Sequence, residues 1–137
     1  MKKVMKATML IMGMLFVFSS SVNAETKSYA YDLDLNSSKT SAEATKAGGS
    51  SFEEKFYVTQ GDVSRPQDST RYFSYHVRKN GKQVSNGLKL SEDDFDRHYN
   101  SYYSGKAIAN TKYKLYCKLT GYGDNSFGAG VRGRWTP

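Results

Sequence analysis

The chain has 137 residues, of which 38% are hydrophobic and 14% aromatic, and its formal net charge is +7. A single cysteine excludes an intramolecular disulfide. The two histidines lie in none of the common hydrolase, metalloprotease or Cys–His motifs. The sequence therefore predicts a protein that is not an enzyme, with no catalytic residue, no metal site and no cofactor.

Residues 1–24 have the layout of a secretory signal peptide. Three lysines precede an apolar run, Met9–Phe18, and Val22–Ala24 places small residues at the positions that signal peptidase reads. The apolar run is too short for a comfortable membrane span. We expect cleavage between Ala24 and Glu25, release outside the cell, and a mature chain without a membrane span.

The mature chain is rich in tyrosine and poor in branched aliphatic residues. All 11 tyrosines follow residue 24, and aromatic rings bury large areas and favour strands. We expect a first strand with a flexible Ser/Thr/Gly-rich loop over residues 25–51 and a β-domain core over residues 52–137. Basic residues still outnumber acidic ones after residue 24, which favours anionic partners.

The first half of the mature chain shows strand patterns separated by turns. Alternating apolar residues predict strands over Tyr29–Leu35 and Phe52–Val58, whereas Asn36–Ser51 has no apolar period and predicts a flexible loop. Gln60–Ser69 contains Gly61 and Pro66 and is typical of a turn.

The second half begins with a hairpin pattern. Alternation over Phe73–Val77 runs into Asn80-Gly81, a strong two-residue turn signal, and a return strand over Val84–Leu90. Ser91 with the acids behind it is typical of a helix start, and aromatic spacing up to Tyr103 predicts a short helix that ends at Gly105.

Two further strands, Lys112–Leu119 and Phe127–Trp135, close the chain around a Gly-rich turn. Together the elements predict an all-β fold, a small antiparallel β-sandwich or partly open barrel of about six strands with one short helix. We expect this domain to be a monomer.

Asp32–Glu43 places oxygen-bearing side chains at the spacing of an EF-hand calcium loop. Ser37 stands at the sixth position, where such loops need glycine, and the segment before it alternates like a strand instead of a helix. The pattern therefore favours a solvated strand end over a calcium site.

The lone cysteine, Cys117, lies in the apolar alternation of the Lys112–Leu119 strand. The pattern favours a buried thiol that packs as a small hydrophobe. Dimerisation through it and catalysis are the alternatives.

The last two strands supply the candidate binding site. If they form a hairpin centred on Gly123, every apolar side chain of both strands lies on one side. The other side then carries a basic stripe that suits an anionic ligand. The alternative is a solubility device built from edge-strand lysines. The candidate residues are Lys112, Lys114, Tyr116, Lys118, Arg132 and Arg134.

Several short motifs resemble an uncharacterised family of small secreted proteins from Gram-positive bacteria, described only as a domain of unknown function. They are Arg71-Tyr72-Phe73, the Tyr99–Tyr103 segment, Tyr113-Lys114-Leu115 and Gly130–Trp135. The resemblance covers roughly the second half of the chain. It implies secretion and a β-fold, and it implies no catalytic residue.

These observations predict a secreted, non-enzymatic binding module that acts at the bacterial exterior. The expected partner is an anionic cell-wall polymer or polysaccharide, and no nucleic acid is expected. The alternative is an antibacterial or toxin-like secreted effector, which would also use a basic, aromatic surface.

Overall fold

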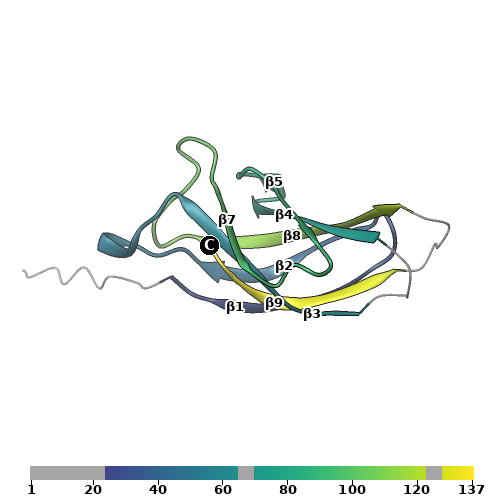
Figure 1. Cartoon of the computed structure of the whole chain (residues 1–137). Helices are drawn as coiled ribbons and strands as arrows, with labels where there is room; N and C mark the ends of the chain where they lie inside the picture. Colours follow the sequence, from purple (N-terminus) through teal and green to yellow (C-terminus); the bar gives the residue numbers. More distant parts are fainter. Residues whose placement is uncertain (1–23, 65–69, 123–127) are drawn as a thin grey trace, which may run out of the picture.

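A computed structural model describes residues 24–64, 70–122 and 128–137. Within these ranges the chain forms nine β-strands and a single 3₁₀ turn, η1 (Gly49–Ser51), arranged as two antiparallel sheets (Figure 1). The predicted all-β sandwich is therefore confirmed. The predicted signal peptide up to Asn23, and Phe127 of the last predicted strand, lie outside the described residues.

The first sheet, called sheet A here, has the strand order β1-β9-β3-β7. Its strands are β1 (Lys27–Leu33), β9 (Ala129–Thr136), β3 (Lys55–Ser64) and β7 (Arg97–Ser101).

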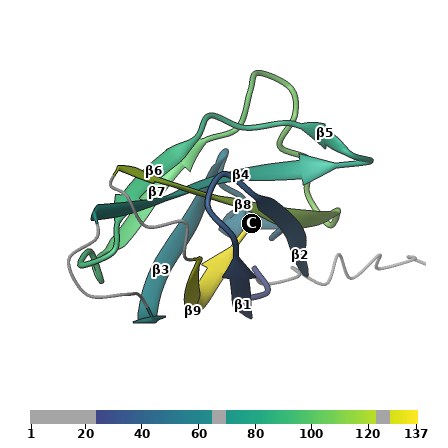
Figure 2. The ribbon, with the colours of Figure 1, turned by 90° about the vertical axis from the view of Figure 1, so that its right-hand side faces the viewer.

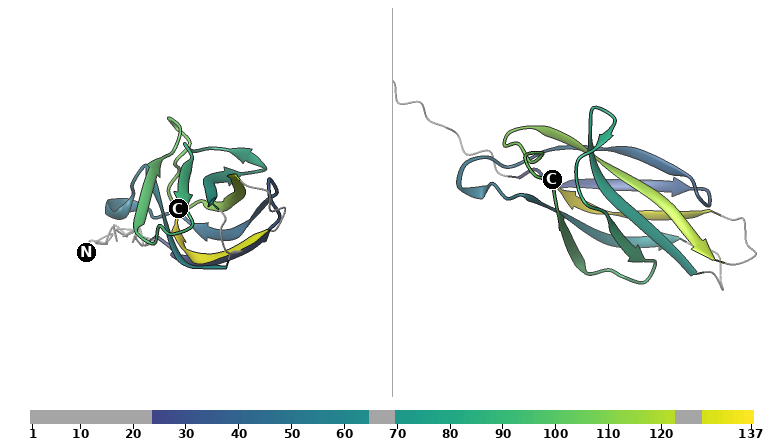
Figure 3. Two further views of the ribbon diagram at one scale, coloured as in Figure 1. Left: turned by 45° about the vertical axis from the view of Figure 1, so that its right-hand side comes forward. Right: turned by 90° about the horizontal axis from the view of Figure 1, so that it is seen from above.

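The second sheet, sheet B, has the order β2-β8-β4-β5, and β6 also pairs with β4. Its strands are β2 (Ser38–Thr45), β8 (Lys112–Tyr122), β4 (Thr70–Lys79), β5 (Lys82–Gln83) and β6 (Leu88–Ser91). Strands β4 and β5 lie on one side of the molecule and β9 and β3 on the other (Figure 2), and Figure 3 shows the two layers from further directions.

The core lies between the inner faces of the two sheets. On β8 the alternate residues Tyr113, Leu115, Cys117 and Leu119 are at most 1% exposed. They pack in one cluster with inward residues of sheet A such as Trp135. The predicted burial of Cys117 is confirmed. Because strand side chains alternate, Lys112, Lys114 and their alternates on β8 point to solvent.

The loop predicted over Asn36–Ser51 is wrong, because this stretch contains β2 and η1. Strand β2 is the edge strand of sheet B and pairs only with β8 among the described strands. Most of its side chains are exposed. Its sequence therefore has no apolar period, although its backbone is held by the sheet.

The helix predicted over Ser91–Gly105 is also wrong. Ser91 ends β6, a turn follows, and Arg97–Ser101 forms β7, which pairs with β3. Tyr99 is 56% exposed whereas Tyr102 is 5% exposed. The helix-like aromatic spacing thus comes from a strand and the loop that follows it. The backbone N–H and C=O groups of Arg97–Ser101 form their hydrogen bonds with β3 instead of within a helix.

The predicted pairing of the last two strands is wrong as well. Strand β8 pairs with β2 and β4, and β9 pairs with β1 and β3, so the two strands lie in different sheets. Gly133 lies opposite Tyr29 of β1. A Cβ at Gly133 would lie 2.0 Å from the carbonyl oxygen of Thr59, so only glycine fits there. Both strands do face one core, but from opposite sides.

Two polar side chains of sheet A reach the backbone of sheet B at a bulge. Ser41 pairs with Leu115 and Ala44 with Tyr113, so β2 has one residue more than β8 in this interval. The Tyr31 hydroxyl donates to the Leu115 carbonyl at 2.6 Å. The indole N–H of Trp135 donates to the carbonyl of Ala42 at 2.7 Å. These hydrogen bonds fix the two sheets relative to each other where the ladder is interrupted.

A second polar contact crosses the core between β4 and β3. The Tyr75 hydroxyl on sheet B donates to Gln60 Oε1 on sheet A at 2.9 Å. Gln60, only 1% exposed, donates in turn to the carbonyls of Ser91 (2.8 Å) and Asp94 (2.7 Å). The buried amide therefore has partners for both its oxygen and its nitrogen, as buried polar groups require.

Substituting Tyr31→Phe tests the contribution of the cross-sheet hydrogen bonds. The variant keeps the ring but removes the donor to a buried carbonyl, and we expect the free energy of unfolding to fall by about 1–3 kcal/mol. The matched control is Tyr99→Phe at an exposed ring, for which we expect a change within about 0.5 kcal/mol. Urea denaturation of both variants measures the difference, and equal small effects would contradict the importance of the contact.

Candidate anion-binding face

The outer face of sheet B carries a cluster of basic side chains, called the basic face here. Glu43 is the single acidic residue in the five described strands of this sheet. Lys112, Lys114 and Lys118 alternate along β8, in agreement with their predicted orientation. The basic side chains of this face are Arg78, Lys89, Lys112, Lys114 and Lys118.

Three side chains in the centre of the basic face are stacked on one another. The rings of His76 and Tyr116, which lie opposite each other on β4 and β8, are stacked 3.9 Å apart at an interplanar angle of 17°. The guanidinium carbon of Arg78 lies 4.4 Å from the centroid of the Tyr116 ring. Arg78 Nε also donates to His76 Nε2 at 2.9 Å. Tyr116 therefore serves to position Arg78, and one of its ring faces is already covered by His76.

The protonation state of His76 follows from these contacts. Burial, and after it the positive charge of Arg78, lowers the pKa of His76 to about 4. The imidazole is thus neutral at neutral pH and is able to accept the hydrogen bond from Arg78. Of the three stacked side chains, only Arg78 carries a positive charge.

Like charges oppose each other on this face. Lys114 lies opposite Arg78 in the register of β8 and β4. Two like charges opposite each other on neighbouring strands lower the free energy of unfolding by less than about 1 kcal/mol. Lys112 lies opposite Thr45 on β2, and its Nζ is 3.8 Å from a carboxylate oxygen of Glu43. The predicted hairpin of the last two strands would place Lys114 opposite Arg132 and Lys112 opposite Arg134, and both oppositions are wrong because β8 and β9 lie in different sheets.

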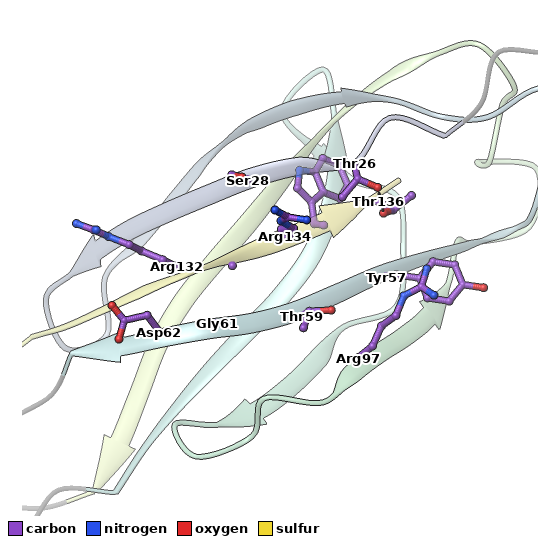
Figure 4. A pocket seen from close by; sticks show the side chains of 12 residues that line it. Thr26, Ser28, Tyr57, Thr59, Gly61, Asp62, Arg97, Arg132, Arg134 and Thr136 are labelled. Atoms are coloured by element: carbon purple, nitrogen blue, oxygen red, sulfur yellow. Dashed lines mark hydrogen bonds between the residues drawn. The ribbon is translucent and has the colours of Figure 1, made fainter.

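Arg132 and Arg134 lie on the outer face of sheet A, on the other side of the core (Figure 4). Asp62 of β3 is the cross-strand neighbour of Arg132. The six candidate residues thus divide into four on the basic face and two on the opposite surface. The sequence analysis grouped these six residues wrongly for one reason. Period-2 alternation shows which side chains point inward or outward, but it does not show which strands are neighbours.

The basic face also contains residues that the sequence did not assign to the site. The contact of Arg78 and His76 with Tyr116 depends on the pairing of β4 with β8, which the sequence analysis did not predict. Lys89 joins the face because β6 pairs with the other edge of β4, and its Nζ lies 4.4 Å above the Tyr72 ring. The available signal was the outward alternation of Ser74, His76 and Arg78 on one strand and of lysines on another.

Among the described residues, the single thiol is buried and possible metal ligands are not clustered. No group of three or more His, Cys, Asp or Glu side chains is gathered in this part of the chain. Burial raises the pKa of the Cys117 thiol well above its usual range, which makes it a poor nucleophile. The segment from Asp32 to Glu43 enters from β1 and leaves through β2, so its predicted strand-like entry is confirmed.

Among the described residues, no helix combines the length and apolar character needed to cross a membrane. Comparisons with protein-family models, curated proteins and solved structures found no match to this chain. Its function is therefore argued from the chemistry of its surfaces, since a β-sandwich by itself implies no activity.

The lowered pKa of His76 predicts a pH-dependent stability. The unfolded chain binds a proton on this residue near pH 6.5, whereas the folded chain does so only near pH 4. The contribution of neutral His76 is therefore complete above about pH 6.5 and is lost as the pH falls towards about 4. Since the ring is half-buried and solvent screens it, we expect a loss of about 1 kcal/mol between about pH 7 and about pH 5. Urea denaturation of wild type and His76→Gln measures this, and an identical pH dependence in both proteins would contradict the assignment.

Proposed function

We propose that this protein is an exported, non-enzymatic binding module that holds an anionic polymer of the bacterial exterior on its basic face. One observation carries the proposal, the opposition of Lys114 and Arg78 on a sheet whose five described strands contain a single acid, Glu43. An anion bound between the two cations would offset their repulsion and add charge-assisted hydrogen bonds.

The spacing of the cations supports a repeating ligand. Alternate residues of a strand lie about 7 Å apart, so Lys112, Lys114 and Lys118 form a row along β8. Arg78, fixed by His76 and Tyr116, offers a planar guanidinium beside this row. A linear polymer with regularly repeated phosphates would engage several of these groups at once, which raises its overall affinity.

Export is part of the same proposal and rests on the pattern of residues 1–24. An exported cationic domain would meet wall polymers and acidic polysaccharides, which supply the negative groups. In this proposal the protein acts as a monomer, because the basic face of one molecule is sufficient to bind the polymer.

Binding of the mature protein to a purified polyol-phosphate wall polymer tests the proposal. We expect affinity to fall steeply as salt rises from about 50 mM to about 200 mM, because bound cations release counterions and charges are screened. Replacing Lys114 and Lys118 together with Gln should weaken binding by about tenfold, or about 1.4 kcal/mol, and reduce the salt dependence.

The matched control replaces Arg132 and Arg134 together with Gln, which removes the same charge from the opposite sheet. This control should bind the polymer like wild type. Equal losses in both double variants would show a response to net charge alone, and no loss in either would refute binding at the basic face.

A further inference from the structure

The outer face of sheet A is hollowed into a concavity of about 540 Å³ (Figure 4). This volume falls within the range of roughly 300–1,000 Å³ that is typical of small-ligand sites. The concavity lies across β1, β9, β3 and β7, so a rigid sheet forms its floor. It is on the opposite side of the core from the basic face and shares no residue with it.

Backbone geometry and small side chains create the hollow. Strand β3 has a bulge between Gln60 and Asp62, with Gly61 as the extra residue, and bulges bend a strand and increase its twist. Ser28, Thr59 and Gly61 are small residues in the lining. Longer side chains, those of Tyr57, Arg97 and Arg132, rise around them (Figure 4).

Four Ser and Thr side chains contribute hydroxyl groups to a lining whose exposed surface is mostly apolar. Thr26 and Thr136 lie side by side, with their hydroxyl oxygens 2.9 Å apart, and Ser28 and Thr59 add two more. A hydroxyl is able both to donate and to accept a hydrogen bond. It therefore complements the hydroxyls of a sugar, which have the same dual capacity.

The charged groups of the lining are mostly positive. The guanidiniums of Arg97, Arg132 and Arg134 stand against the single carboxylate of Asp62. A guanidinium binds a carboxylate through two parallel hydrogen bonds. The lining as a whole therefore favours a ligand that carries both hydroxyls and negative charge.

Aromatic contacts hold one wall of the concavity in place. The guanidinium carbon of Arg97 lies 4.0 Å from the Tyr57 ring centroid, and the Tyr57 hydroxyl donates to the Glu53 carboxylate. This hydrogen bond raises the pKa of Tyr57. The neighbouring Tyr99 ring, 5.8 Å from Tyr57, is 56% exposed. Arg97 is thus presented on a packed aromatic base, beside an exposed ring.

We infer that this concavity is a second binding site, for a short stretch of polysaccharide that bears carboxylates. Arg97 and Arg134 pair with the carboxylates of the ligand. The Ser and Thr hydroxyls, with Asp62, bind the sugar hydroxyls. This inference stands apart from the proposed function, because it concerns another sheet and a ligand defined by sugar hydroxyls as well as by charge.

Calorimetric titration of the mature protein with an oligogalacturonate tests the inference, and the fully methyl-esterified oligomer of the same length is the matched ligand. We expect saturable binding of the acid form and binding at least about tenfold weaker for the ester, which cannot form bidentate carboxylate pairs. Arg134→Gln should weaken binding of the acid form by about tenfold, and Thr59→Val, which loses one hydroxyl, by about two- to tenfold.

Lys114→Gln on the basic face is the control and should leave this binding within about twofold of wild type. Thermal melts confirm that each variant is folded. The inference is overturned if the ester binds as tightly as the acid, if no binding is seen at millimolar oligomer, or if Lys114→Gln and not Arg134→Gln abolishes it. The last result would assign the saccharide to the basic face and would leave the proposed function intact. Equal binding of a sulfated oligosaccharide with no uronate would also overturn the assignment to carboxylates.

Discussion

The arrangement of the whole domain depends on hydrogen bonds that cross from the side chains of one sheet to the backbone of the other. Tyr31 and Trp135 of sheet A donate to carbonyls of β8 and β2 at the bulge of β2. A core built from tyrosine gains area from each ring but must also satisfy each buried hydroxyl. Here the hydroxyls of Tyr31 and Tyr75 fix the position of one sheet on the other. The same requirement explains the buried amide of Gln60, which connects Tyr75 to the turn after β6.

Because the two sheets are held in this way, their outer faces are fixed as separate surfaces with different chemistry. Sheet B presents a row of lysines and the stack of His76, Tyr116 and Arg78. Sheet A presents a hollow lined by hydroxyls and guanidiniums. The hydrogen bonds between the sheets and the buried aromatic rings stabilise the fold. They offset the free energy that is lost through repulsion between the opposed cations of the basic face. A module with two such faces would be able to connect two polymers, or two positions on one polymer.

The sequence predicted which residues face the core but not which strands are neighbours. Alternation over β1, β4 and β8 was read correctly because each strand has one buried and one solvated face. Strand β2 was not predicted because an exposed edge strand has no apolar period in its sequence. Strand β7 was not predicted because the aromatic residues of this strand and the following loop have the spacing of a helix. The candidate site divided for the same reason. The prediction that Lys114 and Arg132 point outward was correct. Only the pairing of β8 with β4 shows that Arg78, and not Arg132, is the neighbour of Lys114.

The most direct test of the proposed function is a residue-by-residue map of the contact surface. Amide chemical shifts of the isotopically labelled mature protein, recorded with and without the polyol-phosphate wall polymer, provide such a map. The proposal predicts shift changes along Lys112–Lys118 of β8 and the facing Ser74–Arg78 of β4, with β9 unchanged. Changes centred on Arg132–Arg134, or spread evenly over both sheets, would contradict it.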